Sequence, residues 1–481
     1  MPKNSPRIAL LGCLLALGLA PAAQAYAPLQ MGIHDPGASG GAELPFQRIQ
    51  ESGASITREA VLWSSVAPGG DTKPAGFDAR DPGAPAYNWT TVDGFVRAAA
   101  ARGLSPLLTT YAAPAWAEGD DAADHNRRFG DAGTYHPNAK HYGDFMFAMA
   151  KRYSGSYTPP GQSSPLPQVK LFQAWNEPNF GQYLTSKRQS DIPVYYAKLL
   201  NAFYDNVKSV SRSNLVIAAG LGPYGNNGHA TDVDPQLFMR TLMCLSGKGG
   251  ERLRAVRSCR VPKPKFDIWS QHPYTFGGKP TTSAISDDGA SLGNMGDVVR
   301  TLKFAVRKRK VLPRGSKRLW VTEFAWFSNP PGLVAGSGKQ LGLPFNRHAA
   351  YLSESAYRLW RQGFSAYVWY SLEDLGGFPS GLFSGSGADA QPKPAFTAFR
   401  FPFYAEASRS GILVWGLASG AGKTTVRIER QSGSSFRSVG ELSTDRQGMF
   451  YTRLRGGRGT YRAVVLSGPK KDLQSLTFTA R

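Results

Sequence analysis

The chain has 481 residues, of which 41% are hydrophobic and 12% aromatic, enough apolar side chains for a large core. This composition excludes a chain that is disordered throughout, and 54 Gly and 34 Pro without a three-residue period exclude a collagen-like chain. The 56 Lys and Arg against 34 Asp and Glu give a net charge of +22, which favours anionic surroundings but identifies no partner.

The first 25 residues have the pattern of a secretory signal peptide. Lys3 and Arg7 precede an apolar run over 8–20, and the Ala-Gln-Ala of 23–25 resembles a cleavage site. The apolar run is too short to cross a bilayer, and no later segment is long and apolar enough to do so. We therefore expect a secreted, extracellular protein.

Short strand-like runs alternate with helix-like runs from about residue 28 onward. The eight strand candidates are 29–34, 55–62, 105–111, 170–175, 215–219, 266–271, 318–322 and 365–370. Between several of them apolar residues recur at helical spacing, at 138–153, 194–210, 297–311 and 348–360. Eight such units predict a (β/α)8 TIM barrel over 26–404. The alternative, a doubly wound open sheet, lacks its glycine-rich fingerprint after the first strand.

The pattern changes to strands alone near residue 405. Six short alternating runs separated by turns predict a small all-β sandwich as an accessory domain over 409–481. These residues hold 13 Lys and Arg against 4 Asp and Glu, a net charge of 13 − 4 = +9. Such a surface favours an anionic cell-wall or extracellular polymer as a partner. The competing interpretation is a structural cap on the barrel.

Cys244 and Cys259 are the two cysteines that remain after removal of a signal peptide. In an oxidising compartment, two cysteines this close in sequence most simply form a disulfide bond, which stabilises a short loop by about 3 kcal/mol. The alternative is two unpaired buried thiols. Two cysteines with no nearby histidine make a poor zinc site, and we expect no metal and no other cofactor.

Two glutamates each end an apolar run that is predicted to be a strand. Glu177 follows the fourth strand and Glu323 ends the seventh. Because the carboxyl ends of barrel strands open on one face, the two acids are expected to meet there. Hydrolysis of a glycosidic bond needs such a pair, one acid to protonate the leaving oxygen and the other to attack carbon or activate water. The alternative is that each glutamate only pairs with an arginine.

The stretches QAWNEPNF (173–180) and LWVTEFAW (319–326) resemble the retaining (β/α)8 glycoside hydrolases of clan A, in particular families 5 and 39. The resemblance spans about residues 29–404. It implies that Glu177 is the acid/base and Glu323 the nucleophile.

The same resemblance implies roles for further residues. Asn176 would bind the sugar 2-hydroxyl, Arg58 would lie near the nucleophile, and Tyr274 would hydrogen-bond the nucleophile. Trp369 would form the aromatic floor beneath the sugar, because a flat indole face suits sugar C–H surfaces. The remaining candidates for the substrate-binding surface are His272, Trp326, Trp116 and His34.

Together these features predict a secreted retaining glycosidase that cleaves β-O-glycosidic bonds of a poly- or oligosaccharide. The alternative is a carbohydrate- or cell-envelope-binding protein on the same scaffold with little catalysis. The two carboxylates at matched strand ends argue against it, because binding alone does not need both. The sequence contains no recognisable nucleic-acid-binding module.

Overall fold

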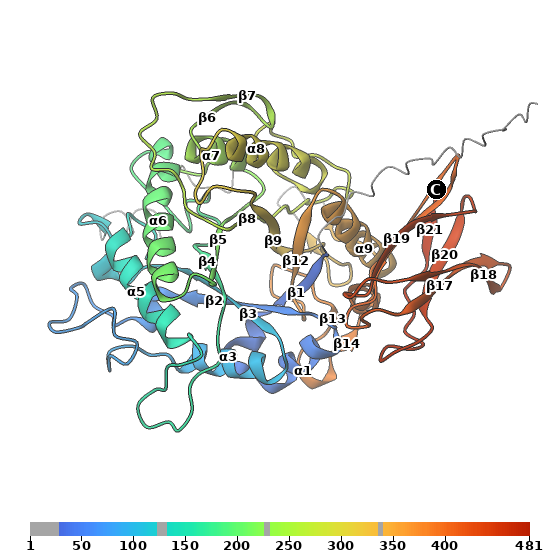
Figure 1. Cartoon of the computed structure of the whole chain (residues 1–481), viewed down its shortest axis with the longest axis horizontal. Coiled ribbons are helices and arrows are strands. Elements are labelled where there is room, and N and C mark those ends of the chain that lie inside the picture. The colour runs from blue at the N-terminus through green and yellow to red at the C-terminus, as the bar shows by residue number, and fades with distance from the viewer. Residues whose placement is uncertain (1–27, 123–131, 226–230, 335–339) are drawn as a thin grey trace, which may run out of the picture.

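The computed structural model of the chain describes residues 28–122, 132–225, 231–334 and 340–481. The signal peptide expected over 1–25 lies outside these residues. Eight parallel strands close into a barrel, which fills the larger part of the molecule (Figure 1). In barrel order the strands are β1 (Gln30–His34), β12 (Phe364–Tyr370), β9 (Arg318–Phe324), β8 (Ile268–Gln271), β5 (Leu215–Leu221), β4 (Leu171–Ala174), β3 (Ser105–Tyr111) and β2 (Ile56–Leu62). The predicted (β/α)8 barrel is confirmed.

Helices surround the barrel and cover the outer faces of its strands. They are α1 (Glu43–Glu51), α2 (Trp63–Val66), α3 (Thr90–Ala101), α5 (Ala139–Arg152), α6 (Ile192–Val210), α7 (Pro235–Leu242), α8 (Met295–Arg307), α9 (Phe345–Arg361) and α10 (Pro394–Arg400). The start of α5 illustrates the local signals, since the Asn138 side chain accepts hydrogen bonds from the Lys140 and His141 amides. Tyr142 and Phe145, three residues apart, then bury the inner face of this helix.

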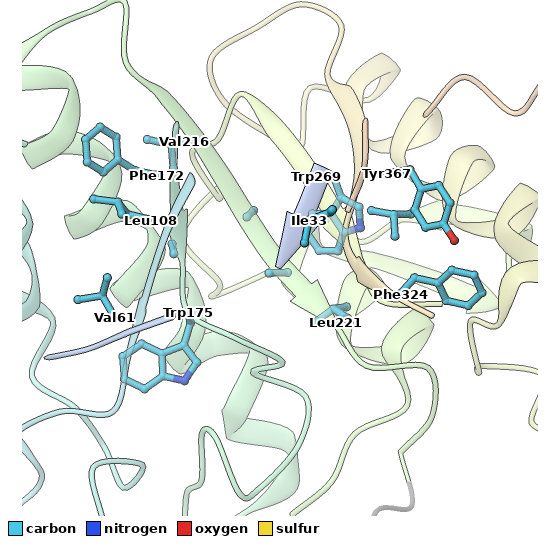
Figure 2. Close-up of a cluster of buried hydrophobic side chains, with 14 of the residues drawn as sticks. Ile33, Val61, Leu108, Phe172, Trp175, Val216, Leu221, Trp269, Phe324 and Tyr367 are labelled. Carbon is cyan, nitrogen blue, oxygen red and sulfur yellow. The ribbon is translucent and has the colours of Figure 1, made fainter. Parts of the chain in front are cut away.

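Two layers of side chains leave the barrel strands in opposite directions, because successive residues of a strand point to opposite faces. The outward layer packs between the strands and the helices, and Figure 2 shows Leu108, Trp269 and Tyr367 within it. The inward layer fills the centre of the barrel with Ile56, Leu107, Leu171, Ile217, Ile268, Trp320, Ala366 and Val368. The barrel is therefore a packed core, and a site can form only where its strands end.

A short hairpin carries the two cysteines on the barrel's periphery. It pairs β6 (Leu245–Lys248) with β7 (Glu251–Ala255), and Cys244 and Cys259 are joined by a disulfide bond just outside it. The predicted disulfide is thus present in the structure. The small hairpins β10 (Leu333–Val334) with β11 (Gln340–Leu341), and β13 (Phe383–Ser384) with β14 (Gln391–Pro392), lie in the loops after β9 and β12.

Two antiparallel sheets follow the barrel and pack face to face as the predicted sandwich. One consists of β15 (Phe403–Ser408), β16 (Gly411–Leu417) and β19 (Met449–Leu454). The other consists of β18 (Ser435–Ser443), β17 (Thr425–Ser432), β20 (Gly459–Val465) and β21 (Phe478–Ala480). Val414 and Phe403 of the first sheet share a buried core with Ile428 and Ala463 of the second. The strand β15 begins within the stretch that the sequence pattern assigns to the barrel.

An aromatic contact joins the sandwich to the barrel through α9 (Figure 1). Tyr404 of β15 stacks on Tyr357 of α9 with ring centroids 4.2 Å apart. Trp415 of β16 lies 5.9 Å from the ring of Trp360, and both rings are buried. One continuous hydrophobic cluster therefore spans the two parts, which favours a structural role for the sandwich. Within the described ranges, no helix combines the length and apolar character needed to cross a membrane.

Candidate active site

The site rests on a polar layer directly above the apolar centre of the barrel. Arg58, Thr109, Gln173 and Thr322 each lie two residues beyond an inward apolar residue of the same strand, so they also point inward. All four are buried. Buried polar groups are generally hydrogen-bonded, and here Arg58 bonds to Glu323 directly while Thr322 is linked to Glu177 through His272.

Glu177 reaches the barrel axis through a tight turn after β4. Trp175 and Glu177 have φ values of 70° and 40°, in the left-handed region that favours glycine. Their backbone amides donate to the carbonyls of Thr110 (3.0 Å) and Gly220 (3.1 Å), which holds the turn against neighbouring strands. Such a backbone costs about 1–3 kcal/mol per residue and is typical of functional sites.

Glu323 lies within β9 and receives hydrogen bonds on both of its oxygens. The guanidinium of Arg58 donates Nη1–H to Oε2, and the Tyr274 hydroxyl donates to Oε1 over 3.0 Å. Arg58 also donates to Asn176 Oδ1 (2.6 Å) and to Thr109 Oγ1 (2.9 Å), so it joins the motif around Glu177 to that around Glu323. Arg58, Asn176 and Tyr274 therefore lie where the sequence analysis expects them.

The two carboxylates are close to each other and to solvent. One oxygen of Glu177, one of Glu323 and a ring nitrogen of His272 all lie within 4.8 Å of one another. The side chains of Glu177 and Glu323 keep 9% and 15% of their area exposed, so a bound molecule can reach both. A carboxyl separation of about 5–5.5 Å accompanies retention of configuration in glycosidases, whereas inversion needs roughly 6.5–9.5 Å.

The surroundings move the pKa values of the two acids in opposite directions. Burial raises the pKa of Glu177, the negative charge of Glu323 adds to this, and a hydrogen bond from His272 partly offsets it. Burial alone would also raise the pKa of Glu323. However, the electrostatic attraction of His272 and Arg58 outweighs burial and lowers the pKa of Glu323 to about 2. One acid is thus suited to hold a proton and the other to stay ionised.

His272 is placed differently from its predicted role as a sugar ligand. It is fully buried between the catalytic pair and the core, with Nδ1 2.9 Å from Glu177 Oε1 and Nε2 3.0 Å from Thr322 Oγ1. Thr322 in turn lies 2.6 Å from the Ser270 hydroxyl. This buried position does not support the predicted direct contact with substrate. The hydrogen bond between His272 and Glu177 orients the Glu177 carboxyl and lowers its pKa.

Trp369 is likewise not the floor of the site. Its side chain is fully buried, donates to the Ser380 carbonyl over 3.0 Å, and packs against His348 of α9. Since Ala366 and Val368 point into the barrel, Trp369 must point outward. The next residue, Tyr370, faces inward, stays partly exposed and stacks on His34 with centroids 5.1 Å apart. Tyr370 is the residue of β12 that faces the carboxylates.

The other two predicted tryptophans pack against neighbouring aromatic residues. Trp326 is 4% exposed and donates to Ser355 of α9, although one edge lines a small pocket of about 110 Å³ together with Phe276 and Phe327. Trp116 packs on the buried Trp63 and donates to the Pro68 carbonyl. The predicted substrate contacts of Trp326 and Trp116 are not supported by these positions.

His34 does lie beside the site. Its Nδ1 is 2.9 Å from the Arg58 carbonyl oxygen. Burial and the charge of Arg58 lower the pKa of His34 to about 4, so the ring is neutral at pH 7. Sequence reasoning missed Tyr370, Thr322 and Thr109. The inward alternation along each strand is the signal that identifies them.

Glu177, His272 and Glu323 also have the spacing of a three-ligand metal site. Their donor atoms are already engaged, since Arg58 and Tyr274 use both oxygens of Glu323 and His272 uses both ring nitrogens. The permanent positive charge of Arg58 would repel a cation. The arrangement therefore fits proton transfer and nucleophilic attack better than metal binding.

Comparison with solved structures identifies the class of fold. A monomeric β-xylosidase from Caulobacter crescentus CB15 matches with a TM-score of 0.50 and 14% identity, over 90% of this chain and 94% of that one. The GH39 enzyme from Xanthomonas axonopodis pv. citri matches with a TM-score of 0.50 and 13% identity, over 89% and 91%. No family model and no curated protein sequence matches the chain.

At this level of identity the comparison shows a shared fold. The chain is a (β/α)8-barrel protein with a C-terminal β-sandwich, and its fold is the one implied by the resemblance to clan A glycoside hydrolases.

Proposed function

We propose that this protein is a retaining glycosidase that hydrolyses β-O-glycosidic bonds in a poly- or oligosaccharide. The observation that carries the proposal is the pair Glu177 and Glu323. One carboxylate oxygen of each lies within 4.8 Å of the other, and the pKa of Glu177 is raised while that of Glu323 is lowered. The carbohydrate-active structures with the same fold are consistent with this assignment.

In the first step, Glu323 attacks the anomeric carbon while Glu177 gives its proton to the departing glycosidic oxygen. The new bond joins Glu323 to the sugar, and the bond to the leaving alcohol breaks. Arg58 and Tyr274 hold the Glu323 carboxylate in one orientation for attack. The amide nitrogen of Asn176 is the group available to donate to the sugar 2-hydroxyl, because Arg58 occupies its oxygen.

In the second step, water replaces the sugar on Glu323. Ester formation removes the negative charge of Glu323, which lowers the pKa of Glu177 and lets it act as the base. His272 donates to the resulting carboxylate of Glu177. Water then attacks the anomeric carbon, the bond to Glu323 breaks, and the configuration is retained overall.

A protein that only bound carbohydrate would not need this arrangement. Holding two carboxylates together in a buried site is unfavourable unless they have partners or a catalytic role. The left-handed backbone at Glu177 adds to that cost. The binding-only alternative is therefore disfavoured.

We further propose that the protein is exported, on the strength of the signal-peptide pattern over 1–25, and acts on extracellular material. An anionic cell-wall or extracellular polymer is the partner proposed for the basic C-terminal sandwich.

Variants of the two glutamates test the mechanism. The chain over 26–481 would be assayed on aryl β-glycosides and β-linked polysaccharides, beside Glu177→Gln and Glu323→Gln. We expect Glu323→Gln to lose at least about 10³-fold in kcat. The matched control is Glu59→Gln on β2, a buried glutamate whose carboxyl contacts Ser39 rather than the site.

Azide distinguishes the two roles. With Glu323→Ala it should give a glycosyl azide of inverted configuration, and with Glu177→Ala one of retained configuration. Activity of Glu323→Gln within a few-fold of wild type would refute the proposal.

A further inference from the structure

One end of the β-sandwich carries positive charge from arginine alone. Three connections meet there, namely the turn between β15 and β16, the turn between β17 and β18, and the connection from β19 to β20. Arg481 lies at the same end, because Ala480 of β21 pairs with Gly459. Residues 407–411, 430–437 and 453–460 contain no Asp, Glu or Lys. We call this group of exposed side chains the arginine end, and it consists of Arg409, Arg430, Arg437, Arg453, Arg455 and Arg458.

Strand register places these residues together, although three lie on the strands β17, β18 and β19 and the other three lie in two connections. Ile412 of β16 pairs with Leu454 of β19, which brings the turn at 409–410 beside 455–458. Arg430 of β17 pairs with Tyr461 of β20 and donates to the Arg458 carbonyl over 2.8 Å. Arg453 donates to Ser408, which links the same two turns across the first sheet.

Like charges face each other directly at this end. Arg430 and Arg437 are cross-strand partners in the β17–β18 hairpin, an arrangement that destabilises a sheet. Among the described residues, no ion pair neutralises any of the six arginines. The neighbouring Glu429 does not compensate, because it is buried and bound by Arg427 (2.9 Å) and Arg462 (2.7 Å).

The opposite end of the sandwich is different. Its loops carry lysines and aspartates together, and Ser419 lies against Gly53 of the barrel. The arginine end is therefore at the far end of the strands from this barrel contact. The arginines at this exposed end repel one another, and they lie away from the contact that stabilises the sandwich. This arrangement points to an anionic ligand that relieves the repulsion.

We propose that the arginine end binds an anionic polysaccharide that carries carboxylate groups on its sugar rings. A guanidinium presents N–H donors in a planar fork that matches a carboxylate, and a row of arginines suits a polymer with repeated carboxylates. The choice of a polysaccharide rests on the glycosidase function proposed above. The sandwich would then hold the barrel near a polymer of the kind that it cleaves.

Features of this end distinguish it from other polyanion-binding surfaces. Among the described residues, no exposed large apolar side chain lies at the arginine end. Tyr451, which is exposed elsewhere in the sandwich, packs on Trp360 and Arg361 of α9. Insertion into a lipid surface is therefore disfavoured. One face of Phe436, the aromatic residue of the hairpin, is covered by the Arg462 guanidinium 3.9 Å from the ring centroid, which disfavours stacking of nucleic-acid bases there.

The test compares two four-charge variants of the chain over 26–481, both carrying Glu323→Gln so that no polymer is degraded. The first combines Arg430→Gln, Arg437→Gln, Arg455→Gln and Arg458→Gln. The matched control removes four positive charges at the opposite end of the same domain, and combines Lys423→Gln, Arg446→Gln, Lys470→Gln and Lys471→Gln. Binding would be measured to polygalacturonate, neutral dextran, phosphatidylglycerol vesicles and duplex DNA over a range of NaCl concentrations.

We expect polygalacturonate to bind and to dissociate as salt is raised, and dextran not to bind. The arginine-end variant should weaken binding at least about tenfold, if each lost contact contributes what an exposed ion pair does. The control should change binding less than about threefold and keep the wild-type Tm. The arginine-end variant should keep or exceed that Tm, because it relieves the repulsion between Arg430 and Arg437.

Equal weakening in both variants would attribute binding to net charge and overturn the proposal. So would failure of polygalacturonate to bind, or tighter binding of vesicles or DNA. Hydrolysis of aryl β-glycosides by the otherwise wild-type enzyme is a separate readout. Its absence refutes the glycosidase function and leaves the result on the arginine end intact.

Discussion

Replacing Arg58 by Met tests how the barrel keeps Glu323 ionised. The side chain of Arg58 is only 1% exposed, and its guanidinium is the permanent cation in contact with Glu323. Methionine keeps much of the apolar volume but removes the charge and the hydrogen bonds to Glu323, Asn176 and Thr109. The variant should therefore lose one contribution to stability that depends on pH and another that does not.

The pH-dependent contribution follows from the pKa of Glu323. That pKa is lowered from 4.5 to about 2, which corresponds to about 3 kcal/mol. Because the folded-state pKa is the lower one, this stabilisation is present above pH 4.5 and is lost as pH falls towards 2. At pH 3 about 1 kcal/mol of it remains. Arg58 shares the effect with His272, so we expect the destabilisation by Arg58→Met to shrink by about 1–2 kcal/mol between pH 7 and pH 3.

Urea unfolding at pH 7, 5, 4 and 3 measures this difference in the free energy of unfolding. The control is the same substitution in a Glu323→Gln background, where the penalty of Arg58→Met should not depend on pH. The acid limb of the kcat/KM profile should also move to higher pH in Arg58→Met, because Glu323 becomes easier to protonate. A penalty of equal size at pH 7 and pH 3 in the Glu323 background would refute the reasoning.

Two further predictions concern the residues whose placement differs from the sequence expectation. His272→Gln should move the alkaline limb of kcat/KM to higher pH with little change in KM. The hydrogen bond from His272 lowers the pKa of Glu177, so its loss raises that pKa. A raised KM with an unchanged limb would instead indicate direct sugar binding. Tyr370→Ala should raise KM about tenfold through loss of a ring contact. Trp369→Ala should leave KM unchanged and destabilise the fold by about 3–5 kcal/mol, as measured by urea unfolding. The opposite result for this pair would refute the assigned directions of their side chains.

The barrel could be predicted because its signals are local. Each strand is a short apolar run bounded by turn residues, and each long helix shows a repeating apolar face, as in 138–153. The strand β15 was missed because its residues 403–408 adjoin a helix and lack clear polar alternation. Its role depends on contacts such as Tyr404 with Tyr357, which no short stretch of sequence can reveal.

The charged part of the site could also be predicted, for a different reason. A carboxylate at the end of a buried strand is costly without a partner, so Glu177 and Glu323 stand out one at a time. That Glu323 contacts Arg58 follows from closure of the barrel, which brings residues 265 apart in sequence together. The position of Glu177 and Glu323 at strand ends was sufficient to predict that their carboxylates lie close together, but not the distance between them.

The aromatic part of the site shows where residue type misleads. Trp369 was chosen because an indole suits a sugar and because the resemblance favours tryptophan on the eighth strand. Its direction, however, depends on alternation along β12, where Ala366 and Val368 occupy the inward positions. The irregular register between β12 and β9 at this point places the extra residue on β9, where Thr322 and Glu323 lie opposite Val368, so the alternation along β12 is unbroken at Trp369. Alternation of buried small residues is therefore a better guide to the inward face than the identity of the aromatic residue.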